Sequence, residues 1–174
     1  CLFSKAFQNR PVDALPDMLG DLGIDAIDLT VRPGGHVLPE RVADDLPRAF
    51  ERFRSAGIAM PMITTGITDA DEDHAEAILT TVAKLGIRYV KIGYYRYSDL
   101  DKIQATLADA GPRLRDVAAL CKRHGLTAGY HNHSGNFLGA ALWDIWGLIR
   151  DLDPAAIGSY FDVGHATAEG AYAG

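Results

Sequence analysis

The stretch GLTAGYHNH, residues 125–133, contains the features that decide the fold. Its first residue, Gly125, suits the position just after a helix, where a left-handed backbone carries no penalty for a residue without Cβ. The largely apolar run that follows predicts a strand covered on both faces, as in a parallel sheet. In such a strand His131 and His133 point to the same face, where both imidazoles can meet one metal ion or polar substrate.

The same pattern, a glycine followed by an aliphatic residue and a strand-like run, occurs at three earlier places in the chain. These places are Gly23-Ile24, Gly57-Ile58 and Gly86-Ile87. Two further strands are expected, one at residues 1–3 and one from Ile157, which makes six strands. Between the strands lie amphipathic helical patterns, over residues 12–22, 46–53, 75–85, 114–121 and 142–149.

Strands that alternate with helices predict parallel strands joined by right-handed crossovers, in an open doubly wound sheet or a barrel. The dinucleotide-binding open sheet is disfavoured, because residues 4–11, SKAFQNRP, follow the first strand without a glycine-rich phosphate loop. A barrel also predicts polar residues at the carboxyl ends of its strands, and this chain has them. We therefore expect an α/β chain with the (β/α)8 TIM-barrel fold, with about the first six β/α units present.

Two details of the helices are also predicted. Gly111-Pro112 should divide the segment 99–124 into two helices, because proline has no N–H for the helical hydrogen-bond ladder. Trp143 and Trp146 should pack against the sheet rather than bind a cofactor.

The composition limits the partners of the protein. Its 174 residues are 48% hydrophobic and 23% charged, which suits one domain spanning residues 1–174. A net charge of −6 argues against a protein that binds duplex nucleic acid, which needs a basic surface. No apolar run approaches the roughly 20 residues that a membrane helix requires. We expect neither a nucleic-acid nor a membrane partner, and a soluble, cytoplasmic protein.

Polar residues with functional chemistry collect where the strands are expected to end. They are Asp28, Thr30, Arg32, Thr64, Thr65, Lys91, Tyr94, Tyr95, His131, Asn132, His133, Asp162 and His165. Because the carboxyl ends of barrel strands meet at one end of the barrel, these side chains should form a single site. Each histidine alone could cap a helix or bond a backbone carbonyl, but the cluster favours a metal ion or a carbonyl or diol substrate.

The step Asp162-Val-Gly-His165 strengthens the metal hypothesis. One ion can take an oxygen from Asp162, with His165 either a second ligand or a donor that faces the substrate. His36 lies in a loop rich in proline and glycine, and it is either a binding residue or part of a surface turn. Glu169 either bonds substrate hydroxyls or caps a helix.

Three segments give the chain a resemblance to a known superfamily. They are GIDAIDLTVRPGGHVLPERV (23–42), GYHNHSGNFLGAALWD (129–144) and IGSYFDVGHATAEG (157–170). The chain resembles the xylose-isomerase-like TIM-barrel superfamily and, within it, a branch of sugar phosphate isomerases and epimerases. The resemblance covers essentially the whole chain, and it implies that the natural protein continues beyond Gly174 with two further strands.

The resemblance also implies one divalent metal ion, Mn²⁺, Mg²⁺, Co²⁺ or Zn²⁺. Asp162 matches one of the family's ligands, and His131 stands where the family usually has a glutamate ligand. The other two ligands are implied to lie on the two strands beyond this chain. Asp28 stands where many members have a glutamate.

The leading hypothesis is a divalent-metal-dependent isomerase or epimerase of a sugar, keto-sugar or sugar phosphate, acting through an enediolate. The expected metal ligands are Asp162 and His131, the catalytic residues His165, His133, Lys91 and Asp28, and the substrate-binding residues Arg32, His36, Tyr94, Asn132 and Glu169. The alternatives are a keto-sugar lyase or dehydratase on the same site and a non-catalytic sugar-binding barrel. Phosphodiester cleavage is disfavoured, because a several-metal site needs more His and Glu at the strand ends. The expected partner is a small-molecule carbohydrate, and a homo-oligomer is compatible with this function.

Overall fold

The computed structural model describes residues 1–170, and its six strands form one sheet in chain order, β1-β2-β3-β4-β5-β6. The strands are β1 Leu2–Phe3, β2 Ala26–Val31, β3 Ala59–Thr65, β4 Tyr89–Lys91, β5 Thr127–His131 and β6 Ile157–Tyr160. Every neighbouring pair is parallel. This α/β arrangement is that of a partial TIM barrel, as the sequence predicts.

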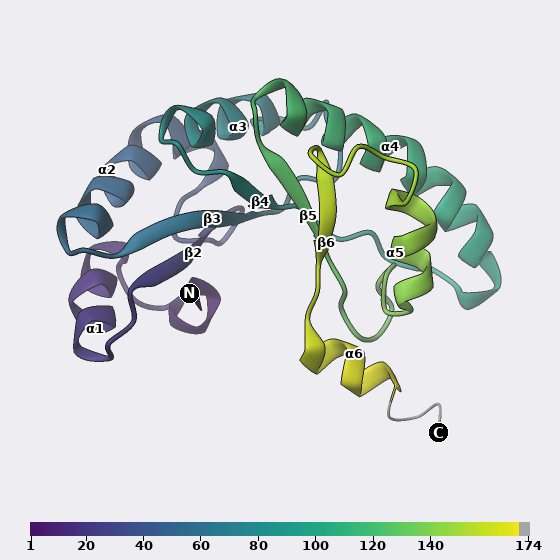
Figure 1. Cartoon of the computed structure of the whole chain (residues 1–174), viewed down its shortest axis with the longest axis horizontal. Coiled ribbons are helices and arrows are strands. Elements are labelled where there is room, and N and C mark those ends of the chain that lie inside the picture. The colour runs from purple at the N-terminus through teal and green to yellow at the C-terminus, as the bar shows by residue number, and fades with distance from the viewer. Residues whose placement is uncertain (171–174) are drawn as a thin grey trace.

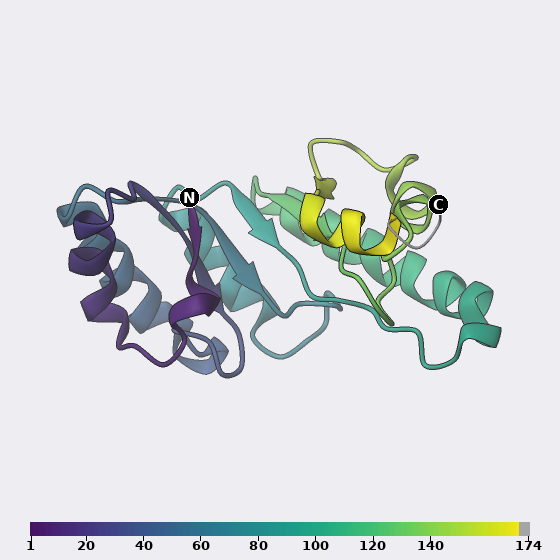
Figure 2. The ribbon, with the colours of Figure 1, turned by 90° about the horizontal axis from the view of Figure 1, so that it is seen from below.

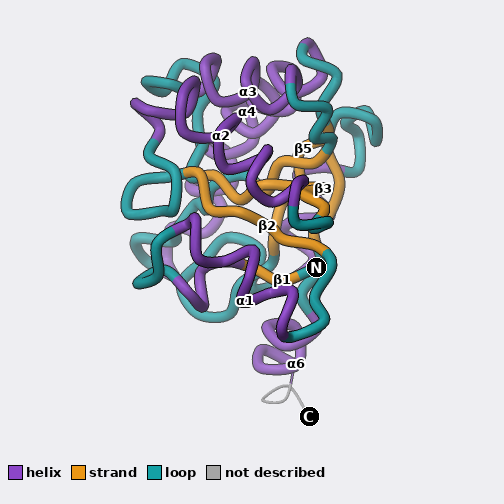
Figure 3. The backbone as a smooth tube through the Cα atoms, turned by 90° about the vertical axis from the view of Figure 1, so that its left-hand side faces the viewer, coloured by secondary structure: helices purple, strands orange, loops and turns teal. Residues whose placement is uncertain are grey.

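The helices of the described residues are α1 Leu15–Asp21, α2 Val42–Ser55, α3 Ala75–Lys84, α4 Ile103–Arg123, α5 Leu142–Ile149 and α6 Val163–Gly170, with short 3-10 turns at η1 Ser4–Phe7, η2 Val12–Ala14, η3 Pro39–Arg41 and η4 Leu100–Lys102. The helices other than α6 lie around the outside of the curved sheet, with α2, α3 and α4 along its convex side (Figure 1). Figure 2 shows the successive units following one another across the molecule, and Figure 3 shows α6 set apart from the layer of α2, α3 and α4. None of the helices within residues 1–170 has both the length and the apolarity needed to cross a membrane.

Alternation along the strands separates the core from the concave face of the sheet. In β2, Ile27, Leu29 and Val31 are completely buried among apolar neighbours, whereas Asp28 and Thr30 lie between them in sequence and point the other way. The helices contribute buried apolar side chains to the same core at helical spacing, such as Leu46, Phe53, Leu79, Val82, Leu114, Val117 and Cys121. The polar side chains of the strands are therefore left for the concave face.

A glycine at the end of each of the helices α1 to α4 turns the chain back toward the sheet. Gly125 has a φ of 69°, and the N–H of Leu126 donates to the Cys121 carbonyl at 2.9 Å. This bond closes the end of α4 in a way that needs the left-handed backbone of glycine. Positive φ recurs at the three equivalent glycines, Gly23, Gly57 and Gly86. The repeated glycine motif thus marks helix ends, as predicted.

The prediction that Gly111-Pro112 divides a helix is wrong. Pro112 lies inside α4, which runs unbroken for 21 residues. Packing explains why: Ala110 and Leu114 are both buried on either side of the proline. A Cβ added to Gly111 would lie 3.5 Å from Leu148 of α5, so the helices are also closely apposed here. Tertiary burial holds both halves of α4 in one helix although Pro112 cannot donate to the ladder.

The prediction for the two tryptophans is also wrong. Trp143 is 81% exposed and Trp146 is 57% exposed, whereas Ile145 between them is buried. The eight-residue helix α5 is apolar around most of its circumference, but only a narrow stripe faces the core. The tryptophans occupy the opposite face, so composition alone misplaces them.

Candidate active site

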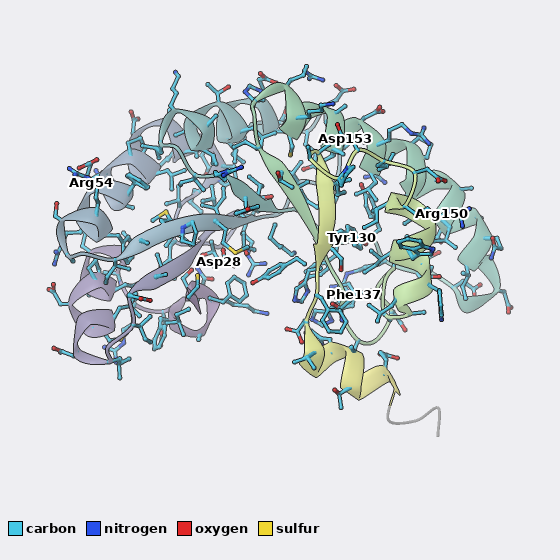
Figure 4. All side chains as sticks on the ribbon, in the orientation of Figure 1. Asp28, Arg54, Tyr130, Phe137, Arg150 and Asp153 are labelled. Atoms are coloured by element: carbon cyan, nitrogen blue, oxygen red, sulfur yellow. The ribbon has the colours of Figure 1, made fainter. Side chains whose placement is uncertain are left out.

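A cavity of about 320 Å³, here called the concave cavity, opens at the carboxyl ends of the strands. Its lining residues are Phe3, Lys5, Asp28, Thr64, Lys91, Tyr94, His131, His133, Tyr160, Asp162 and His165. Figure 4 shows Asp28 beside the first strands of the curved sheet and Phe137 on the opposite side, near α6. The Phe137 ring packs against His133. Strands that are far apart in sequence therefore contribute to one polar hollow, as the barrel prediction requires.

His131, the last residue of β5, faces Asp162, which directly precedes α6. The His131 Nε2 atom lies 3.4 Å from Asp162 Oδ2, and the Tyr94 hydroxyl lies 2.9 Å from His131 Nδ1. Burial, followed by the charge of Lys91, lowers the pKa of His131 to about 4. The imidazole is thus neutral near pH 7, the form in which histidine binds metal ions.

Two groups position the Asp162 carboxylate. The His165 backbone N–H donates to Asp162 Oδ1 at 2.8 Å, so Asp162 caps the first turn of α6. This hydrogen bond, followed by the neighbouring histidines, lowers the pKa of Asp162 below its ordinary value. Asn132 holds the backbone of the same residue: its amide donates to the Asp162 carbonyl at 2.8 Å and accepts from the Asp162 N–H at 2.6 Å. The carboxylate is charged, and its Oδ2 faces His131.

The rings of His133 and His165 pack against each other at an interplanar angle of 30°, beside the pair of His131 and Asp162. Their ring centroids are 3.9 Å apart, and the His133 ring also packs on Phe137 at 4.3 Å. His133 Nδ1 lies 2.8 Å from the Ser134 carbonyl oxygen. Because a carbonyl oxygen only accepts, this contact assigns the proton to Nδ1 and leaves Nε2 of a neutral His133 with a lone pair. His165 Nδ1 contacts the Ser134 hydroxyl at 2.9 Å.

Asp28 is a buried carboxyl group on the concave face of β2. It is 2% exposed, and the Thr64 hydroxyl donates to its Oδ2 at 2.8 Å. Its other oxygen, Oδ1, is buried without a hydrogen-bond partner among the described residues. Burial raises the pKa of Asp28 to about 6, although Thr64 and Lys91 act in the opposite direction. An unpartnered buried oxygen of this kind is costly unless a donor arrives from a ligand.

Lys91 ends β4 on the same face and is 3% exposed. Its Nζ atom lies 3.4 Å from the centroid of the Tyr94 ring. Burial lowers the pKa of Lys91 to about 7, helped by the charge of Arg32 and opposed by Asp28. Burial also raises the pKa of Tyr94 to about 12, so this phenol stays protonated near pH 7.

Of the eleven residues expected to be catalytic, substrate-binding or metal-binding, four lie outside the lining of the concave cavity. Three further residues expected at the same strand ends, Thr30, Thr65 and Tyr95, also lie outside it. His36 bridges two elements, with Nδ1 3.0 Å from the Thr30 hydroxyl and Nε2 3.1 Å from the Phe7 carbonyl oxygen. Arg32 lines a separate cavity of about 320 Å³ between the loops that follow β2 and β3. Glu169 accepts a hydrogen bond from the Gly135 N–H. The side-chain amide of Asn132 forms two hydrogen bonds with the backbone of Asp162.

Sequence reasoning missed three aromatic or basic residues of the lining, namely Phe3, Lys5 and Tyr160. Tyr160 could have been found, because it stands two residues before Asp162 and so shares its strand face. Phe3 ends β1 and Lys5 comes two residues later, and a strand of two residues gives too little alternation to assign a face.

Two of the described residues could hold a metal ion together. His131 Nε2 and Asp162 Oδ2 are nitrogen and oxygen donors close enough to bind one divalent ion. Within residues 1–170 no group of three His, Cys, Asp or Glu side chains is placed to hold a metal. The pair therefore fits two of the four ligands that the resemblance implies.

Solved structures of low sequence identity share this fold. The probable 3-DHS dehydratase AsbF of Bacillus anthracis matches with a TM-score of 0.76 at 14% identity, over 97% of this chain and 64% of that chain. D-psicose 3-epimerase of Clostridium cellulolyticum H10, solved with D-tagatose, matches with a TM-score of 0.66 at 13% identity, over 89% and 59%. A xylose isomerase-like TIM barrel protein of Mycobacterium smegmatis in complex with magnesium matches with a TM-score of 0.66 at 16% identity, over 92% and 60%.

The chain thus spans less than two thirds of the length of these three structures. No curated protein matches its sequence. A family model described as the xylose isomerase-like TIM barrel matches residues 16–173, nearly the whole chain. Together with the parallel sheet in chain order and the polar hollow at the strand ends, this match shows that the chain belongs to the xylose isomerase-like TIM-barrel family.

Proposed function

We propose that the protein is a divalent-metal-dependent isomerase or epimerase of a sugar, keto-sugar or sugar phosphate. One observation carries the proposal: the concave cavity combines the donor pair of His131 and Asp162, 3.4 Å apart, with a histidine, His133, whose Nε2 is free to accept a proton. A proton acceptor beside a site that polarises a carbonyl is what proton transfer between sugar carbons requires. The epimerase among the similar structures supports the sugar class.

The residues around the donor pair hold it in place. A divalent ion, when bound by His131 and Asp162, would supply Lewis-acid polarisation of neighbouring carbonyl and hydroxyl oxygens. Tyr94 fixes the imidazole ring of His131 from its other nitrogen, and Asn132 and the His165 N–H fix Asp162. Partners of this kind orient metal ligands and are costly to remove.

The proton-transfer roles follow from hydrogen-bond polarity. We assign His133 Nε2 as the acceptor of the α-proton, since its Nδ1–H is committed to the Ser134 carbonyl. His165, stacked on His133, is assigned to bond a substrate oxygen. On the far side of the concave cavity, Asp28 Oδ1 is assigned to accept from a substrate hydroxyl, and Lys91 to steady developing negative charge.

A keto-sugar dehydratase is the second candidate, and one observation favours it. AsbF, the similar structure with a TM-score of 0.76, is a probable dehydratase. Elimination of water from a keto-sugar begins with removal of the same α-proton, so His133 and the donor pair would serve both reactions.

Proton exchange in deuterated water tests both proposals. The protein is incubated with Mn²⁺ and keto-sugars such as D-fructose and D-tagatose, and the sugars are followed by NMR spectroscopy. Deuterium at the α-carbon with a new epimer or isomer supports the isomerase or epimerase, whereas an unsaturated product supports the dehydratase. Binding without exchange in the presence of any of the four metals would leave a non-catalytic sugar-binding barrel. Variant His133→Gln should lose exchange, and chelation by EDTA should abolish it.

A further inference from the structure

The amine of Lys91 is buried but not paired. Its side chain is 3% exposed, yet within residues 1–170 it donates no hydrogen bond and forms no ion pair. Its only close partner is the Tyr94 ring, 3.4 Å from Nζ to the ring centroid. A buried lysine without a carboxylate or carbonyl partner is unusual, since the ammonium form is costly to desolvate.

The space beside this amine is open. Lys91 lines the concave cavity and also a second cavity of about 230 Å³ on the inner face of the sheet. Lys91 pairs in register with Gly129, and Gly129 pairs with Gly158. Neither glycine carries a side chain. Tyr160 packs over Gly129, 3.2 Å from where a Cβ would stand, whereas nothing lies within 4 Å of that position at Gly158. Lys91 lines both cavities, so a small molecule in either of them can approach its amine.

The charges around Lys91 favour its neutral form. Burial is the main cause that lowers the pKa of Lys91 to about 7, and the cations Arg32 after β2 and Lys5 of η1 act in the same direction. Asp28 of β2 raises the pKa and is the only anion among these causes. A neutral amine is the nucleophilic form of lysine, and desolvation is a usual way to obtain it.

We propose that Lys91 is a carbonyl-trapping nucleophile that forms an imine with a small aldehyde or ketone held in the concave cavity. The Nζ lone pair forms a bond to the carbonyl carbon, and the carbonyl oxygen takes a proton to become the hydroxyl of a carbinolamine. Nitrogen loses one proton to give the neutral carbinolamine. The hydroxyl then takes a proton and leaves as water while the nitrogen lone pair forms the C=N bond, and nitrogen loses its second proton to give the neutral imine. The sum is amine plus carbonyl giving imine plus water, with no oxidation or reduction.

Asp28 is the group that moves these protons. Its Oδ1 is buried without a partner, and its Oδ2 accepts from Thr64, the residue that pairs in register with Lys91. The carboxyl group therefore stands on the same face as the amine, one strand beyond Thr64. A carboxyl group that holds its proton more strongly than usual can donate to the departing hydroxyl. This activity goes beyond the metal-dependent reaction proposed above, because it needs no metal ion.

Reductive trapping tests the proposal. The protein is incubated with dihydroxyacetone and sodium cyanoborohydride in the presence of EDTA, and peptide mass spectrometry quantifies modification at each lysine. Lys84, Lys102 and Lys122, which are exposed and lie outside both cavities, are the internal references. At pH 7 we expect Lys91 to be modified at least about tenfold faster than these three lysines, because, of the four, only Lys91 lines a cavity that can hold the ketone beside its amine.

Two variants and a pH series complete the design. Asp28→Asn should slow trapping at Lys91 and leave trapping at Lys102 unchanged, and Lys102→Arg should leave trapping at Lys91 unchanged. From pH 6 to pH 8 the rate at Lys91 should rise most steeply near pH 7 and approach its limit by pH 8. Modification of Lys91 no faster than of the reference lysines in the unmodified, folded protein would overturn the proposal. Since EDTA is present throughout, loss of metal-dependent proton exchange would leave this result untouched.

Discussion

The side chain of Asn132 makes the two hydrogen bonds to the backbone of Asp162 that a neighbouring strand would otherwise make. The last register pair of β5 and β6 is His131 with Tyr160, and beyond it the Asn132 amide donates to the Asp162 carbonyl at 2.8 Å and accepts from the Asp162 N–H at 2.6 Å. The buried amide of Asn132, the residue directly after His131, thus holds Asp162 in place beside His131.

Substituting Asn132 should therefore destabilise the site and the fold together. Asn132 is 1% exposed, so Asn132→Ala opens a gap in a buried place and leaves the partly buried N–H and carbonyl of Asp162 without these partners. We expect a loss of about 2–4 kcal/mol in the free energy of unfolding, measured by urea denaturation. Asn132→Asp can accept from the Asp162 N–H but cannot donate when ionised, so its loss should be of similar size at pH 7. The solvent-exposed change Asn9→Ala is the control, and equal stability of all three variants would contradict the role of Asn132.

Asp28 should make stability depend on pH in a definite window. Its folded pKa, about 6, lies above the unfolded value, so the folded state holds the proton more tightly. The free energy of unfolding should fall as pH rises from about 4 to about 6 and change no further through Asp28 above that, by about 2–3 kcal/mol in all. Asp28→Asn should remove this fall and be more stable than the unmodified protein at pH 7. Thr64→Val deletes the donor to Asp28 Oδ2 and should make this loss of unfolding free energy larger. If the difference in unfolding free energy between Asp28→Asn and the unmodified protein does not change with pH, the carboxyl group of Asp28 does not titrate in a buried place.

Substituting His133 should lower α-proton exchange, whereas substituting a histidine outside the concave cavity should not. His133→Gln should lower α-proton exchange about 10²- to 10⁴-fold, measured in deuterated water with Mn²⁺, while the unfolding midpoint changes little. His36→Gln is the matched control: both ring nitrogens of His36 are bonded to Thr30 and Phe7, so it should lose stability and keep exchange per folded molecule. An unchanged rate of α-proton exchange in His133→Gln would show that another residue accepts the α-proton.

Tyr94 should tune the affinity of His131 for a metal ion. Tyr94→Phe keeps the ring under Lys91 but removes the hydroxyl that lies 2.9 Å from His131 Nδ1. We expect Mn²⁺ to bind about 10- to 100-fold more weakly, measured by isothermal titration calorimetry. Tyr89→Phe makes the same chemical change on a ring that lines the other cavity and should leave the affinity unchanged. Equal affinities for both variants would show that Tyr94 does not orient His131.

The sequence alone determined the order of strands and helices and the class of fold. Gly125 and its three equivalents marked helix ends because a left-handed backbone after a helix is cheap only for residues such as glycine. The position of Asp28 near the expected end of its strand placed it in one site with Lys91, His131 and Asp162, and the parallel sheet brings these residues to the same end. These features are local or follow from connection handedness, so no tertiary detail is needed.

Only the tertiary structure decided where side chains beyond the strand ends point. His133 stands after β5 has ended, yet stacking on His165 keeps it in the concave cavity, whereas His36 turns to Thr30 and Phe7. Arg32 faces another cavity although it follows Asp28 by four residues. Pro112 stays inside α4, because burial on both sides outweighs the missing hydrogen bond. In each case a contact with a distant segment sets the outcome, and local sequence periodicity carries no information about such contacts.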